Sequence, residues 1–144
     1  EDVETVPGTD GRKMSKSYGN TIPLTASREE IERAVFSVPT DSTPIEDPKD
    51  PESDTLFALY RLFASGDDCE SLAARYREGG VGYKEVKDLL VEEVDSFITP
   101  IRTRREELAA DPDHVHKLLH DGAERFRGEV DSTMDAARRA VGIR

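Results

Sequence analysis

Residues 83–101 read YKEVKDLLVEEVDSFITPI, and this stretch decides the fold class. Its apolar residues recur at intervals of three and four, which places them on one face of an α-helix. They are Val86, Leu89, Leu90, Val94, Phe97, Ile98 and Ile101. The stripe predicts a long helix that buries one side. We expect a kink at Pro100, because proline removes a backbone donor from the helix.

Three shorter helices are predicted before this stretch. The sequence SREE at 27–30 has the spacing of a capping box, and the helix that it starts ends at Pro39. A second helix begins at residue 53 or 54, where Ser or Asp caps a stripe of leucine and aromatic residues. A third spans about 68–78 and is ended by Gly79-Gly80.

A last helix is predicted to open with Asp111-Pro112, a cap followed by a first-turn proline. Gly122 and Ala123 on this helix permit a close helix crossing. Its apolar residues are Val115, Leu118, Leu119, Phe126, Val130, Met134 and Ala137. The fold class is therefore all-α, a helical bundle of about five helices at 27–144. Residues 1–26 are predicted to be irregular, since they contain turn dipeptides and no helical period.

The composition excludes several classes of protein. The chain has 144 residues, a net charge of −11 and one cysteine. A strongly acidic chain is a poor general nucleic-acid binder, although local basic patches remain. One cysteine forms no intramolecular disulfide, and no apolar run reaches the length of a bilayer span. These features favour a cytoplasmic protein. The four prolines within 39–53 indicate a linker or a wrapped loop.

The histidines are weak candidates for a metal site. His116 and His120 share one helical face, at a spacing that metal ligands use. However, HKLLH has leucine where a zinc protease helix has glutamate, and no third ligand is close in sequence. We therefore expect surface histidines and assign no metal-binding residue.

The strongest candidate site is the segment GTDGRKMSKSYGN at 8–20, called here the lysine loop. Lys13 and Lys16, three residues apart, are suited to gripping one polyphosphate, and Ser15 and Ser17 add further donors. Lysines in this arrangement stabilise negative charge that develops on a leaving group. A flexible basic surface loop explains the composition equally well.

The exact order of residues in the lysine loop is more informative than its composition. Residues 13–17 read KMSKS, which matches in full the signature of class I aminoacyl-tRNA synthetases. The rest of the chain resembles the bacterial-type tryptophanyl-tRNA synthetases. The similar segments are PGTDGRKMSKSYGNTI, TDSTPIEDPKDPESDTLFALYRLFA, YREGGVGYKEVKDLLVEEVDSFITPIRTRREEL and DGAERFR, in the order of that family.

This resemblance implies an activity. The family uses ATP, with magnesium, to form tryptophanyl-adenylate and then transfers tryptophan to its tRNA. It implies that Lys13 and Lys16 are catalytic and contact the β- and γ-phosphates, that Met14 lies near the adenine, and that Ser15 and Ser17 help to hold the loop closed. The whole enzyme is implied to be a homodimer.

The resemblance also implies how the chain is divided. Residues 1–26 correspond to the end of the catalytic domain with its signature loop, and 27–144 to the C-terminal helical domain that binds the anticodon end of the tRNA. No HIGH-type motif and no βαβ pattern occurs in these residues. We therefore expect a C-terminal portion that is inactive alone, with a loop that is mobile in the isolated chain.

Charge alone suggests where the tRNA binds. Arg102, Arg104 and Arg105 form a cluster beside the expected kink, and phosphate contacts would give salt-dependent affinity. A solvated helical face, paired with Glu106 and Glu107, remains the alternative.

Two other identities stay open at this point. The chain also fits the equivalent portion of another class I synthetase, such as the tyrosyl enzyme. A non-enzymatic helical interaction module with a fortuitous phosphate loop is the other reading.

Overall fold

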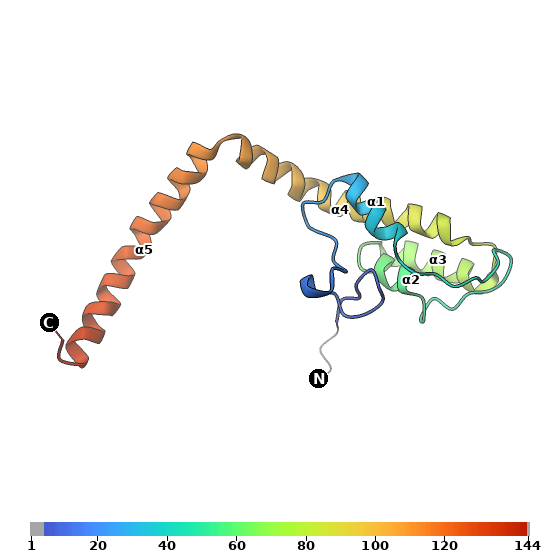
Figure 1. Ribbon diagram of the computed structural model, residues 1–144, viewed down its shortest axis with the longest axis horizontal. Coiled ribbons are helices and arrows are strands. Elements are labelled where there is room, and N and C mark those ends of the chain that lie inside the picture. Colours follow the sequence, from blue (N-terminus) through green and yellow to red (C-terminus); the bar gives the residue numbers. More distant parts are fainter. Residues whose placement is uncertain (1–4, 144) are drawn as a thin grey trace. The chain divides into compact units, whose positions relative to one another are not determined.

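The computed structural model describes residues 5–143. Within that range the chain forms five α-helices, one short 3-10 helix and no strand (Figure 1). Pro7 and Lys13 form an isolated β-bridge. The predicted all-α class is confirmed. The chain divides into two compact units, one up to Thr103 and the other from Arg104 onward.

The centre of the first unit is the helix predicted from residues 83–101. This helix, α4, spans Tyr83–Ala110 and continues through Pro100 without interruption. Its buried residues are Val86, Leu90, Val91, Val94 and Ile98. Each such side chain contributes roughly 1.5–3 kcal/mol when it is fully buried. The predicted stripe is only partly correct, because Phe97 is 52% exposed and Ile101 37% exposed.

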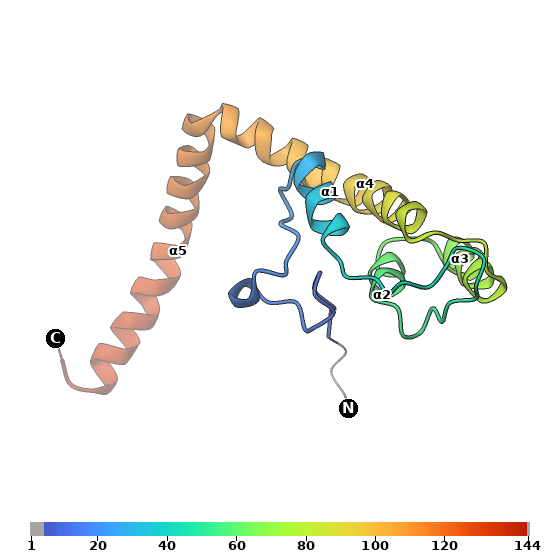
Figure 2. The ribbon, with the colours of Figure 1, turned by 45° about the vertical axis from the view of Figure 1, so that its right-hand side comes forward.

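Three short helices surround α4 in the first unit. They are α1 at Arg28–Phe36, α2 at Thr55–Tyr60 and α3 at Gly66–Glu78. The two views in Figures 1 and 2 place α1 against α4, where Arg28 pairs with Glu92 and Asp95. Buried residues from all four helices form one core.

The predicted helix starts are largely confirmed. The Ser27 hydroxyl accepts from the Glu30 N–H, and the Glu30 carboxylate accepts from the Ser27 N–H, which completes the capping box. Asp54, one of the two predicted caps, caps α2. The helix α3 begins two residues earlier than predicted, since the Ser65 hydroxyl accepts from the Asp68 N–H.

The proline-rich segment at 39–53 is a wrapped loop. Lys49 is only 7% exposed, and its ammonium donates to the carbonyl of Pro44 at 2.7 Å. The backbone N–H of Lys49 donates to the carbonyl of Tyr76 at 2.7 Å, and the Gly80 N–H donates to the carbonyl of Ile45. The loop therefore lies against the end of α3.

The second unit contains α5, which spans Pro112–Ala140. Asp111 caps it as predicted, with Pro112 in the first turn. No residue of α5 is buried, and Phe126 is 68% exposed. A Cβ at Gly122 would meet nothing within 4 Å, so the expected close helix crossing is not found in the described part of the chain. Periodicity predicts an apolar face but not what covers it.

Candidate functional site

The lysine loop is folded by its own backbone. The Gly8 N–H donates to the carbonyl of Arg12 at 2.7 Å, and the Met14 N–H donates to the carbonyl of Val6 at 2.8 Å. Gly11 lies in the turn between them, at a φ of 78° that favours glycine. These bonds give the first half of the loop one defined path.

Asn20 joins the two ends of this loop and is only 2% exposed. Its side-chain oxygen accepts from the Ser15 N–H at 2.8 Å. Its side-chain nitrogen donates to Asp10 at 2.7 Å and to the carbonyl of Lys13 at 3.1 Å. Its backbone carbonyl accepts from the Thr9 N–H at 3.0 Å.

A close approach accompanies these bonds. A Cβ added at Gly8 would collide with the Asn20 amide and lie 2.9 Å from its carbonyl oxygen. The loop packing therefore needs glycine at this position. Sequence reasoning noted Asn20 only as part of the family pattern and assigned it no role. No local pattern in the sequence identifies it, because its partner Asp10 lies ten positions away.

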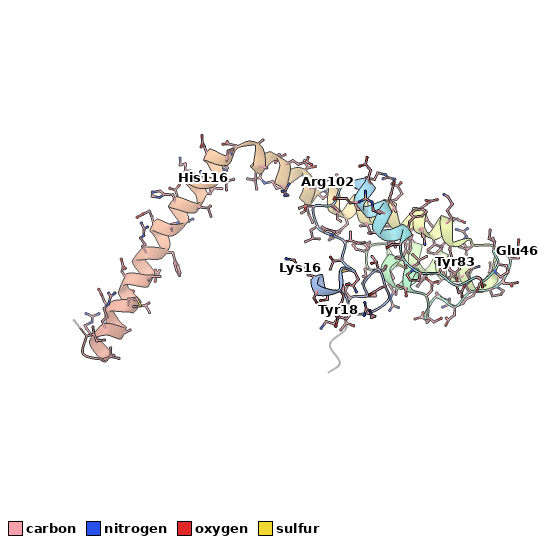
Figure 3. The ribbon with its side chains drawn as sticks, viewed as in Figure 1. Lys16, Tyr18, Glu46, Tyr83, Arg102 and His116 are labelled. Atoms are coloured by element: carbon pink, nitrogen blue, oxygen red, sulfur yellow. The ribbon has the colours of Figure 1, made fainter. Side chains whose placement is uncertain are left out.

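Both signature lysines are exposed on the folded loop. Lys16 begins the 3-10 helix at Lys16–Tyr18, which Figure 3 shows at the tip of this segment. Within residues 5–143, neither Lys13 nor Lys16 makes an ion pair with a carboxylate. The hydroxyls of Ser15 and Ser17 share a hydrogen bond at 2.8 Å. As far as the structure describes the chain, the loop therefore exposes two ammonium groups that have no carboxylate partner.

Arg12 and Asp10 form an ion pair on the side of the loop. The Arg12 guanidinium donates to Asp10 at 2.7 Å and lies 4.9 Å from the centroid of the Tyr18 ring. The hydrogen bond from Asn20, followed by the bonds from Arg12, lowers the pKa of Asp10 to about 2. Asp10 is therefore a carboxylate at neutral pH and holds Asn20 in one orientation.

Met14 lines an apolar groove of about 270 Å³ beside the loop. The other lining residues are Val6, Ile22, Leu24, Leu59, Leu62, Phe63, Val94, Phe97 and Ile98. Leu24 is 58% exposed, and Phe97 meets Phe63 with ring centroids 5.4 Å apart. Met14 thus faces an apolar environment, whereas Lys13 and Lys16 face solvent.

The arginine cluster is divided between the two units. In the first unit the Arg102 guanidinium donates to the Ala26 carbonyl at 2.6 Å, to Asp95 at 2.9 Å and to Thr99 at 3.0 Å. In the second unit Arg104 pairs with Glu107 at 2.9 Å, and Arg105 is exposed. The bond to Ala26 holds the end of the N-terminal segment against α4, the helix that contains Arg102.

The histidines and the cysteine give little evidence of a functional site. His116 and His120 are both exposed on α5, and no three His, Cys, Asp or Glu side chains gather as a metal site within residues 5–143. Burial raises the pKa of the Cys69 thiol, which keeps it protonated. None of the helices described is long and apolar enough to span a membrane.

Residues 3–99 match a family model that is described as class I tRNA synthetases for tryptophan and tyrosine. The chain belongs to this family. It is 49% identical to the tryptophan–tRNA ligase of Rhodopirellula baltica, over 96% of this chain and 43% of that protein. It is 43% identical to the ligase of Xanthomonas axonopodis, over the whole chain and 33% of that protein.

The fold of the chain also matches that of solved tryptophanyl-tRNA synthetase structures. The crystal structure of tryptophanyl-tRNA synthetase from Campylobacter jejuni with ADP and tryptophan superposes with a TM-score of 0.92 at 37% identity. It is matched over 99% of this chain and 45% of that one. The chain thus spans a third to just under a half of the synthetases that it matches. The resemblance to the tryptophanyl enzymes is confirmed, and all of these relatives carry that specificity.

Proposed function

We propose that this chain supplies the phosphate-binding loop and the helical domain of a tryptophan–tRNA ligase. The observation that carries the proposal is the KMSKS loop, whose two lysines are exposed and make no ion pair with any carboxylate in residues 5–143, on a backbone held by Asn20. A relative with the same fold binds ADP and tryptophan, which supports a nucleotide as the ligand. The whole enzyme forms tryptophanyl-adenylate from ATP and transfers tryptophan to its tRNA.

Each residue of the KMSKS signature, 13–17, has a proposed part in the first step. The tryptophan carboxylate attacks the α-phosphorus of ATP, and pyrophosphate leaves with the bonding electrons. Lys13 and Lys16 stabilise the negative charge that grows on the β- and γ-phosphates. Met14 lies near the adenine, and Ser15 and Ser17 hold the closed loop.

Magnesium accompanies ATP in this proposal. No cluster of three potential ligands occurs in the described part of the chain. The ion would be bound by the phosphates of ATP, where it would supply positive charge. Lys13 and Lys16 add the charge that comes from this chain.

The helical part is proposed to bind the anticodon end of the tRNA for tryptophan. Arg104 and Arg105 are exposed and suit phosphate contacts, whereas Arg102 would have to leave three internal partners. A titration of that tRNA against a variant with alanine at Arg104 and Arg105, which leaves the internal bonds of Arg102 in place, tests this. A weaker affinity and a smaller salt slope support the contact. Unchanged values favour a solvated, ion-paired helical face.

The division of labour follows from the same proposal. Residues 1–26 belong to the catalytic domain and 27–144 to the tRNA-binding domain of a cytoplasmic homodimer. The chain alone is proposed to be inactive, because the described residues contain no sheet that would hold ATP and tryptophan.

The lysines are tested in a hybrid ligase, in which this chain replaces the matching portion of the Rhodopirellula baltica enzyme. Lys13→Ala and Lys16→Ala should each lower kcat for tryptophan-dependent ATP–pyrophosphate exchange by about 10²–10³-fold, the usual cost of one lost transition-state donor. Lys117→Ala, an exposed lysine on α5, is the matched control. Activity retained in both loop variants would refute the assigned role.

A further inference from the structure

Asn20 has the smallest exposed fraction among the buried polar residues that the structure describes. The phosphate chemistry proposed above does not use it. Asparagine offers one acceptor oxygen and two donor hydrogens, and a buried amide is costly when these are left unpaired. Here the oxygen accepts one hydrogen bond and the nitrogen donates two, all to groups within the lysine loop. Packing alone does not explain why a polar amide is buried at this position.

The partners of the amide lie on both sides of Met14. Its nitrogen holds the carbonyl of Lys13, and its oxygen holds the N–H of Ser15, directly before Lys16. Two peptide groups of the signature are therefore attached to one buried side chain. The first of these peptide groups adjoins Lys13, and the second ends at Ser15, the residue before Lys16.

Asp10 fixes which way the amide faces. Its carboxylate accepts from the Asn20 nitrogen at 2.7 Å, so the nitrogen faces Asp10 and the oxygen is left for Ser15. Arg12 holds Asp10 in turn, through both its N–H and its guanidinium. A chain of polar contacts thus runs from the exposed Arg12 to the backbone of the signature.

We propose that Asn20 is a positioning residue, which aims Lys13 and Lys16 at the phosphates by fixing the peptide groups on either side of Met14. The inference rests on the proposed function of those lysines. Misplacing a charge-stabilising group by about 1 Å costs as much as 10²-fold in rate. Asn20 therefore acts on kcat through the lysines and touches no substrate itself.

Asn20→Asp in the hybrid ligase is the sharpest test. Aspartate has nearly the same shape, but it places an oxygen against both Asp10 and the Lys13 carbonyl. We expect kcat for ATP–pyrophosphate exchange to fall by about 10–100-fold. The KM for tryptophan should stay within about twofold, because only the phosphate-side lysines are moved.

A second substitution separates positioning from mere stability. Asp10→Asn in the Asn20→Asp protein restores a donor between the two residues, so kcat should recover several-fold. Thr25→Asp adds the same charge at an exposed residue beyond the loop and should leave kcat unchanged. Thermal melting of every variant shows whether the folded fraction differs.

The outcomes distinguish this inference from the proposed function. If the hybrid with the unaltered chain shows no exchange, the proposed function fails and the inference falls with it. If that hybrid is active and Asn20→Asp keeps its kcat, the positioning role alone is overturned. A lowered melting temperature, with no recovery of kcat in the double variant, also overturns it in favour of a structural role.

Discussion

Gly8→Ala tests whether the lysine loop is closed around Asn20 as the structure describes. A Cβ at this position would overlap the Asn20 amide and lie 2.9 Å from its carbonyl oxygen. Unstrained carbon contacts need about 3.5 Å or more. Because one of these contacts is to backbone, a rotation of the Asn20 side chain does not relieve the crowding. Asn20 must retreat by roughly 1 Å.

That retreat has a predictable cost. The bonds from Asn20 to Ser15 and Asp10 are 2.8 and 2.7 Å long. A shift of that size lengthens both beyond hydrogen-bond distance. Each bond contributes about 0.5–1.5 kcal/mol, so the closed loop should lose about 1–3 kcal/mol.

Amide hydrogen exchange measures this loss directly. The Ser15 N–H donates to Asn20, so its protection should fall by about 5- to 150-fold in Gly8→Ala. Leu90, buried in α4, should keep its protection. Gly66→Ala is the control, since a Cβ there meets nothing within 4 Å. Unchanged exchange at Ser15 would refute the described closure.

Three further predictions concern other parts of the first unit. Gly79→Ala should lower the free energy of unfolding in urea by about 1–3 kcal/mol, and by more than Gly80→Ala. Both glycines have positive φ, but only the first places its new Cβ against the Glu46 carbonyl, so equal losses would contradict this account. Arg102→Ala should lower the free energy of unfolding by about 1–3 kcal/mol in the same assay, because three hydrogen bonds are lost. Arg102→Lys should recover part of that loss. An unchanged free energy in Arg102→Ala would show that the three bonds do not stabilise the fold. The pKa of Asp10 is lowered from 3.8 to about 2, so its contribution to loop stability is complete above pH 4 and lost as the pH falls toward 2. Loop amide protection measured over that range should fall in the native chain and stay flat in Asp10→Asn, and identical profiles would contradict the linkage.

The helices were predictable because their signals are local. A capping box at Ser27 and a proline after Asp111 specify where a helix begins, whatever the tertiary structure. Burial was less predictable, because it depends on which element covers each face. Phe97 continues the apolar period of α4 yet is half exposed, and Phe126 on α5 is exposed as well.

The sequence motif identified the lysine loop as a candidate site, but it did not predict the hydrogen bonds inside the loop. The spacing of Lys13 and Lys16 indicates a phosphate grip, and no local rule says how the backbone between them is held. Asn20 reaches Asp10 across ten positions of sequence. That bond exists only because the turn at Gly11 folds the chain back. A single sequence carries no direct sign of such a contact.

We propose that this chain completes the active site of a tryptophan–tRNA ligase. Tryptophan-dependent ATP–pyrophosphate exchange by the hybrid ligase, compared with the chain alone, tests it most directly. We expect exchange by the hybrid, none when tyrosine replaces tryptophan, and none by the isolated chain. Absence of exchange by a folded hybrid, or exchange by the isolated chain, would contradict it.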